Sequence, residues 1–143
     1  MSESRPDAPR YDIQPIGIVR SPLKRREDAP HQGWLGAPAA WIELEDRFAD
    51  GLLGLEPGAE VDVVTWFHLS DRDILQVRPS HDPERRLRGV FATRAPVRPN
   101  PLGIHRVRVL ALEGTRLHVE PLEAVDGTPV VDIKAALTHY DAD

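Results

Sequence analysis

The order of hydrophobic and polar residues predicts short strands and no long helix. The clearest strand covers residues 61–69, which are rich in β-branched and aromatic side chains. Residues 46–53 fit at most one or two helical turns. Further strands are predicted at residues 13–20, 41–45, 87–93, 104–112, 117–122 and 130–133. Short strands separated by turns at this spacing are typical of an all-β barrel or sandwich.

Polar segments and turn residues divide this pattern. Residues 24–36 and 70–86 have no hydrophobic period and predict two long loops, which in small domains are usually functional or disordered. The dipeptide Asp126-Gly127 is a hairpin signal and predicts that strand 130–133 is the return strand. We expect one folded domain over residues 12–137, between a flexible leader (residues 1–11) and a short tail (residues 138–143).

Composition excludes several classes of protein. The 143 residues include 14 prolines, which disfavour a helix bundle, and no cysteine, which excludes disulfide scaffolds and thiol nucleophiles. No apolar run approaches the roughly 18 residues of a membrane span, and residues 1–10 lack the apolar segment of a signal peptide. A cytoplasmic protein is therefore expected. The six histidines lack metal-ligand spacing, so no metal is expected. The glycine motifs of Rossmann and P-loop folds are absent, so a nucleotide site of either kind has no support.

Basic residues concentrate in one part of an acidic chain. The net charge is −5, yet residues 78–108 contain eight arginines and two acidic residues, a balance of +6. Sixteen of the 18 basic residues are arginine, which suits bidentate contact with phosphate and stacking on bases. The segment predicts a local anion-binding face. Arginines that merely solvate the outward faces of strands are the alternative.

Residues 94–101 form a proline-rich segment inside this basic region. Three prolines bias the residues before them toward extended geometry, so the segment is stiff and loses little conformational entropy on binding a ligand. It places Arg94, Arg98 and Asn100 at defined positions. A proline-rich barrel corner without a ligand is the alternative.

Residues 125–134 join a tight turn to a short strand. Asp132 and Lys134 share a face of that strand because strand side chains repeat every two residues. These two residues are either part of a site or one weak surface ion pair.

These segments together resemble one family. FATR at 91–94, RPNPLG at 98–103, DGTPVVDIK at 126–134 and PIGIVRSP at 15–22 are similar to the signature of the TsaA-like, or TrmO, family. Pro30 followed by Gln32 matches as well. The resemblance covers about residues 12–134, in the order of the family.

The resemblance implies a fold and an activity. The expected fold is a small closed or partly open β-barrel of about seven strands, with long loops and at most short helices. The family implies S-adenosylmethionine as cofactor and a homodimer with the cofactor near the subunit boundary. The implied reaction is methyl transfer to N6 of threonylcarbamoyl-adenosine in the anticodon loop of tRNA, which makes tRNA the expected partner.

The resemblance also implies roles for individual residues. The expected cofactor contacts are Gln32, Gly33, Trp34, His68, Leu69, Arg94, Ile104, Glu120, Pro121, Leu122 and Glu123. Site-building or catalytic roles are expected for Asn100, Asp126, Asp132 and Lys134, and contacts to phosphates or an acidic substituent for Arg98, Arg106 and Arg108. A base beside the accepting nitrogen would help the reaction, and the sequence leaves both Asp126 and Asp132 open for that role.

Three other functions stay open. Bacterial tRNA enzymes of this family carry a further C-terminal domain, whereas the sequence ends at Asp143, so the methyl acceptor could instead be a small molecule. A non-catalytic module that binds S-adenosylmethionine is another alternative. A β-barrel that serves only as an interaction protein is the last.

Overall fold

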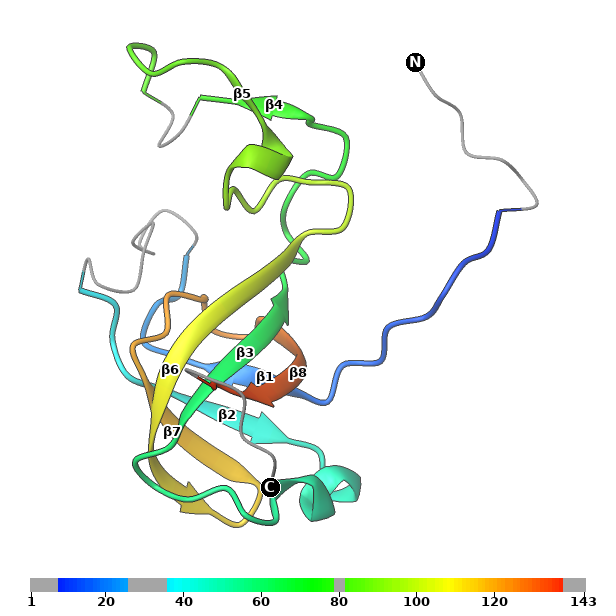
Figure 1. Cartoon of the computed structure of the whole chain (residues 1–143). Helices are drawn as coiled ribbons and strands as arrows, with labels where there is room; N and C mark the ends of the chain where they lie inside the picture. The colour runs from blue at the N-terminus through cyan, green and yellow to red at the C-terminus, as the bar shows by residue number, and fades with distance from the viewer. Residues whose placement is uncertain (1–7, 26–35, 79–81, 138–143) are drawn as a thin grey trace.

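Six antiparallel strands close into a barrel in the computed structural model, which describes residues 8–25, 36–78 and 82–137 (Figure 1). Around the barrel the order is β1 (Gly17–Arg20), β2 (Ala40–Leu44), β7 (Arg116–Glu120), β6 (Leu102–Glu113), β3 (Glu60–Trp66) and β8 (Pro129–Ala135), which pairs again with β1. The expected small all-β barrel is confirmed.

The core of the barrel follows from the alternation of side chains along the strands. In β3 the side chains of Val61, Val63 and Thr65 point inward, and in β6 those of Val107 and Val109 do the same. Inward-facing valine, leucine and isoleucine from all six strands form one buried cluster. Because the sheet closes on itself, these six strands have no free edge.

Residues 67–101 leave the barrel between β3 and β6 and are called the excursion below. In Figure 1 they form the upper part of the molecule. They contain a two-stranded sheet of β4 (Gln76–Val77) and β5 (Arg88–Gly89), followed by the 3-10 helix η5 (Val90–Ala92). The predicted strand at residues 87–93 is therefore wrong beyond its first residues, because its only partner in the sheet is the two-residue β4.

Two other details of the predicted elements differ in the structure. The strand predicted from residue 13 begins at Gly17, since Ile13 and Pro15 are exposed and proline has no amide hydrogen for the ladder. The short helix predicted at residues 46–53 is present as the 3-10 helix η3 (Asp46–Leu52).

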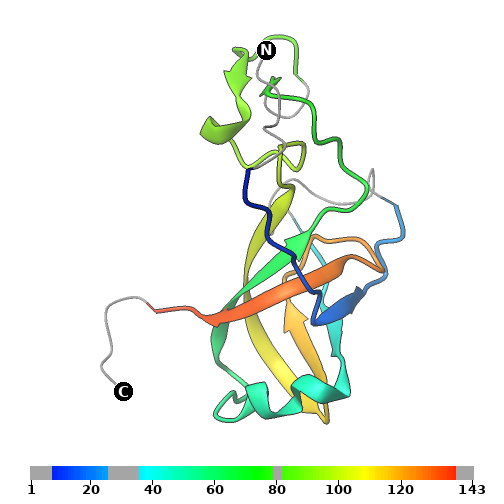
Figure 2. The same cartoon turned by 90° about the vertical axis from the view of Figure 1, so that its right-hand side faces the viewer.

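The predicted hairpin at Asp126-Gly127 is also wrong. The dipeptide does form a turn, with Gly127 at a positive φ of 86° that glycine adopts without strain. However, β8 pairs with β1 and β3 rather than with β7. Figure 2 shows the orange strand β8 crossing one face of the barrel, where it closes the sheet. The connection of residues 121–128 therefore runs across one end of the barrel.

Within the described ranges no helix is long and apolar enough to cross a membrane.

Candidate functional site

The connection 121–128 joins both flanks of the first long loop. The amide of Leu122 donates to the carbonyl of Pro38 at 3.0 Å, and the amide of Asp126 donates to the carbonyl of Leu23 at 2.7 Å. Leu23 and Pro38 flank the loop that contains Gln32, Gly33 and Trp34, three predicted cofactor contacts that lie outside the described residues. The connection is therefore bonded to the described residues on both sides of this loop.

A buried chain of hydrogen bonds links this connection to β6 and β3. The carboxylate oxygen Oε1 of Glu123 lies 2.6 Å from Nδ1 of His105, and Nε2 of His105 lies 2.7 Å from Oγ1 of Thr65. His105 and Thr65 are almost completely buried, whereas Glu123 keeps part of its side chain at the surface. The predicted contact Glu123 is thus held from inside the barrel.

The excursion also contacts the start of β6. The guanidinium of Arg94 donates to the carbonyl of Ile104 at 3.2 Å, so Arg94 contacts the residue before His105. His68 and Leu69 follow directly on β3, and the ring of the preceding Phe67 packs edge-on against His105, with centroids 5.8 Å apart. We define the candidate site as His68, Leu69, Arg94, Ile104 and residues 120–123.

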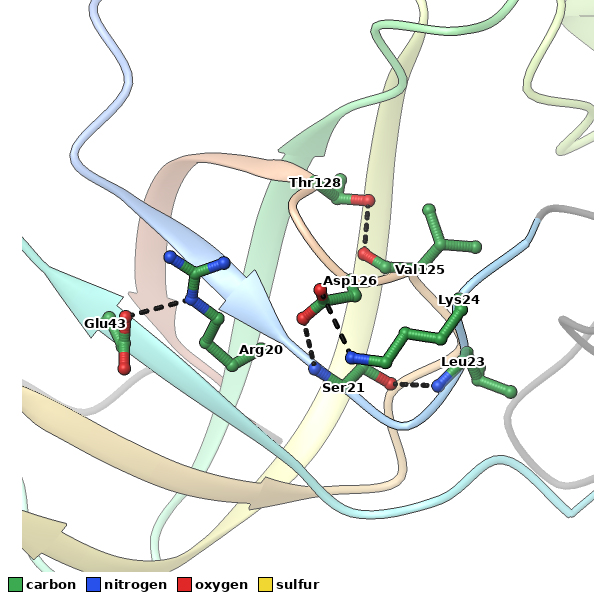
Figure 3. Close-up of polar contacts among 8 residues, drawn as sticks. All are labelled: Arg20, Ser21, Leu23, Lys24, Glu43, Val125, Asp126 and Thr128. Atoms are coloured by element: carbon green, nitrogen blue, oxygen red, sulfur yellow. Dashed lines mark hydrogen bonds and ion pairs between the residues drawn. The ribbon is translucent and has the colours of Figure 1, made fainter.

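Asp126 binds the chain after β1 at the same end of the barrel (Figure 3). Its Oδ1 accepts a hydrogen bond from the amide of Ser21 at 3.0 Å, and its Oδ2 lies 3.3 Å from the ammonium of Lys24. The hydrogen bond from Ser21, with help from Lys24, lowers the pKa of Asp126 below its ordinary value. A carboxylate that is stabilised in this way is a weaker proton acceptor.

The proline-rich segment is fastened by two arginines. Arg72 donates to the carbonyl of Pro99 at 2.6 Å and to the side-chain oxygen of Asn100 at 3.1 Å, while its guanidinium lies over the ring of Trp66. Arg98 donates to two main-chain carbonyls of residues 93–95. The side-chain oxygen of Asn100, a predicted catalytic residue, therefore already accepts a hydrogen bond from Arg72.

Asp132 and Lys134 lie on the outer face of the barrel. Their side chains form an ion pair at 3.6 Å, as their shared strand face predicts. Asp132 on β8 lies opposite Val64 on β3, which lies opposite Ile104 on β6. Because neighbouring strands are about 4.8 Å apart, Asp132 is roughly 10 Å from Ile104 along this row.

Acidic neighbours partly neutralise Arg106 and Arg108 on the same outer face. Arg106 binds both carboxylate oxygens of Asp62, at 2.7 and 3.3 Å, which raises the pKa of Arg106. Arg108 lies 3.5 Å from Glu120. Both arginines, with Glu120 and Pro121, line a shallow hollow between β6 and the start of the connection. These arginines are less available to phosphate than the sequence alone predicts.

The side chain of Leu122 is part of the barrel core and is fully buried. Its side chain is therefore not available to a ligand.

Sequence reasoning missed Thr65, His105 and Arg72. Thr65 shares the inward face of β3 with Val61 and Val63, and His105 shares the inward face of β6 with Val107 and Val109. A polar residue in an inward-facing position was the available signal, because a buried polar group requires a partner. Arg72 gave no such signal, since it lies in a polar segment.

The described part of the chain holds no group of three or more histidine, cysteine, aspartate or glutamate side chains that could bind a metal ion.

Comparison with known proteins gives a consistent result. A family described as "tRNA-methyltransferase O N-terminal domain" matches residues 18–142. The chain is 45% identical over 91% of its length to a "Probable S-adenosyl-L-methionine-binding protein" of Methanothermobacter thermautotrophicus, of which it covers 93%. It is 44% identical over 90% of its length to an "S-adenosyl-L-methionine-binding protein" of Archaeoglobus fulgidus, of which it covers 91%.

Solved structures agree with the fold. The crystal structure of TrmO from Pseudomonas aeruginosa superposes with a TM-score of 0.74 at 34% identity, over 94% of this chain. The present chain spans 59% of that longer protein.

Proposed function

The chain belongs to the TrmO family, as its motifs predict, and we propose that it is an S-adenosylmethionine-dependent tRNA methyltransferase. Its proposed reaction is methylation of N6 of threonylcarbamoyl-adenosine in the anticodon loop. The observation that carries the proposal is the meeting of Arg94, Ile104 and Glu123 at one end of the barrel, beside both flanks of the loop with Gln32.

The residues at this end fit the chemistry of the cofactor. S-adenosylmethionine combines an adenine ring, ribose hydroxyls, an ammonium and a carboxylate, and when bound it supplies an electrophilic methyl group. Glu123 offers a fixed carboxylate to hydroxyl or ammonium donors, and Arg94 offers a guanidinium to a carboxylate. The exposed side chain of Ile104 offers an apolar surface for a ring.

Among the two aspartates left open by the sequence, Asp132 is the better candidate for the proton acceptor. Asp126 is bound to Ser21 and Lys24 and has a lowered pKa, so its part is to fix the connection that carries Glu123. Asp132 is partly exposed on the row that contains Ile104. In this proposal the main contribution of the chain is to align the acceptor, which can contribute several kcal/mol to catalysis.

The arginines of the basic segment divide into two groups as candidates for phosphate binding. Arg94 and Arg98 donate to main-chain carbonyls and have no acidic partner among the described residues, so their charge is available to an anion. Arg106 and Arg108 have acidic partners. We propose Arg98 as the principal RNA contact, whereas Arg94 binds the carboxylate of the cofactor.

We also propose that the protein is a homodimer. The excursion exposes five large apolar side chains, namely Leu69, Ile74, Leu75, Leu87 and Phe91. The start of β6, which follows the excursion in the chain, exposes Leu102 and Ile104. Contact with a second copy would cover apolar surface of this kind. The expected cytoplasmic location stays a prediction.

A binding protein without RNA methylation is the second candidate. The relatives named as S-adenosylmethionine-binding proteins match this chain over more than nine tenths of their length, whereas the TrmO of known structure is considerably longer. This candidate includes transfer to a small acceptor as well as cofactor binding alone.

The decisive experiment supplies labelled S-adenosylmethionine and two tRNA pools, one with and one without threonylcarbamoyl-adenosine. We expect label only in the modified pool, and nuclease digestion with mass spectrometry locates the methyl group on the modified nucleoside. Binding of tRNA should weaken steeply between 50 and 200 mM salt, by about tenfold for each few phosphate contacts. Cofactor binding without transfer to either pool would favour the second candidate.

Arg94→Ala tests the assignment of the site. We expect it to weaken binding of S-adenosylmethionine, whereas Arg47→Ala should leave that binding unchanged. Arg47 is an exposed arginine in η3 that is paired with Glu45. Equal behaviour of the two variants would place the site elsewhere.

A further inference from the structure

Thr65, His105 and Glu123 form one continuous hydrogen-bonded chain from the core of the barrel to its surface. The exposed fraction of the side chain rises from nearly zero at His105 to 20% at Glu123. Thr65 is completely buried. Only the carboxylate end of the chain is therefore within reach of a ligand.

The hydrogen bonds have a consistent direction. An ionised Glu123 only accepts, so Nδ1 of His105 carries the proton that it receives. In that tautomer Nε2 is an acceptor, and the hydroxyl of Thr65 donates to it. Each of the two contacts is short, at 2.6 and 2.7 Å, and no polar side-chain atom buried in the described residues lacks a partner.

Close packing surrounds the imidazole of His105 and the hydroxyl of Thr65. Phe67 packs edge-on against the ring of His105. A Cβ atom at Gly103 would lie 2.5 Å from the ring of Phe67 and 2.7 Å from Oγ1 of Thr65, so glycine is required here. The His105 ring thus has a fixed position, and through it so does the Glu123 carboxylate.

An order of hydroxyl, imidazole and carboxylate also occurs in hydrolases, where the hydroxyl attacks the substrate. Thr65 cannot take that part, because a completely buried hydroxyl meets no substrate. The group that faces outward is the Glu123 carboxylate. Here the hydroxyl and the imidazole support the carboxylate, whereas in those hydrolases the carboxylate and the imidazole support the hydroxyl.

We propose that Thr65 and His105 are positioning residues that fix the Glu123 carboxylate for a hydrogen-bond donor of the cofactor, either a ribose hydroxyl or the ammonium group. The inference rests on the proposed binding of S-adenosylmethionine. It adds two residues inside the barrel that contact no ligand and act only through Glu123.

A double-mutant cycle on binding of S-adenosylhomocysteine tests the proposal. Thr65→Val removes the hydroxyl and keeps the shape of the side chain. We expect its Kd to rise about three- to tenfold by calorimetry, with the fold of the variant checked by circular dichroism, and Thr65→Ser to restore the value within about twofold. Glu123→Ala should weaken binding at least as much. The double variant should bind no more weakly than Glu123→Ala alone, because Thr65 acts only through that carboxylate.

Controls separate the possible failures. Thr115→Val removes a hydroxyl that contacts Asp46 at the opposite end of the barrel, and it should leave the Kd unchanged. If the wild-type protein does not bind S-adenosylhomocysteine, the proposed function itself fails. If the wild type binds but Thr65→Val binds equally well, or if its effect adds to that of Glu123→Ala, the positioning role is refuted. A lower melting temperature with an unchanged Kd would show a purely structural role.

The two kinds of donor are distinguished with methylthioadenosine, which keeps the ribose and lacks the amino-acid ammonium. If Glu123 binds the ribose, Thr65→Val weakens binding of this ligand as well. If Glu123 binds the ammonium, binding of methylthioadenosine is the same in both proteins while binding of S-adenosylhomocysteine is weakened.

Discussion

The barrel and the excursion contain similar apolar residues and bury them differently. In the barrel, side chains such as Ile42 and Leu117 have no exposed surface. In the excursion only Val90 and Pro101 are buried among the described residues, and Phe91 keeps 80% of its surface exposed. The apolar residues of the barrel are explained by their burial in its core. Those of the excursion are explained by a surface that covers them, which we propose is a second copy.

The largest expected effect tests the barrel side of this comparison. Leu117→Ala should lower the free energy of unfolding by about 2–5 kcal/mol, because it leaves a cavity in a closed core. Leu87→Ala in the excursion should change it by less than about 0.5 kcal/mol. Urea unfolding at low protein concentration measures both, since association then contributes little. Similar losses for the two variants would mean that the excursion packs as a second core.

The next effect concerns association. Phe91→Glu places a charge in the proposed dimer surface, so we expect the dimer dissociation constant to rise about 30-fold or more. Light scattering over a range of concentrations measures the change. Leu53→Glu is the matched control, because Leu53 is also exposed but follows η3 outside the excursion. A wild-type protein that is already monomeric at micromolar concentration would contradict the proposed homodimer.

The fold was predictable where local signals and the closed sheet agree. The alternation in β3 and β6 determines which side chains face the core, and the prediction of an all-β barrel is confirmed. The partner of β8 was not predictable from the turn before it. Asp126-Gly127 specifies a local turn, whereas the pairing of β8 depends on long-range contacts that close the barrel.

Gly103→Ala tests the junction between the two regions. The added Cβ would meet Phe67 at the base of the excursion and Thr65 in the barrel, so we expect a loss of about 1–3 kcal/mol of stability. Gly51→Ala is the control, because nothing lies within 4 Å of the position of its Cβ. Thermal unfolding of both variants measures the difference. Equal melting temperatures would show that Phe67 moves aside without cost.

The candidate site was only partly predictable. The motif at residues 91–94 indicated Arg94, and the family resemblance implied residues 120–123; the structure adds the contacts that link them through Ile104 and His105. The sequence could not distinguish an arginine with a free charge from one bound to an acid across the sheet. Arg106 is such a case, because its partner Asp62 is 44 positions away and becomes a neighbour only through the pairing of β3 with β6.

The smallest expected effect concerns Asp126, which ties the connection of the candidate site to the end of β1. Asp126→Asn removes the charge that faces Lys24 and weakens the bond to the amide of Ser21, so we expect a loss of about 1 kcal/mol of stability at pH 7. Asp50→Asn, an exposed change in η3, should cost less than about 0.5 kcal/mol.

The pH dependence gives this last prediction its sign. The folded protein lowers the pKa of Asp126, so the ionised carboxylate stabilises the fold above the pKa of the unfolded chain, about 3.9 for aspartate. That contribution disappears as the pH falls through the lowered pKa, where both states bind the proton. The stability difference between wild type and Asp126→Asn should therefore be constant near neutral pH and shrink in acid. A difference that stays the same down to pH 2 would mean that the charge of Asp126 contributes nothing, and that the connection is held by its main-chain bonds to Leu23 and Val19.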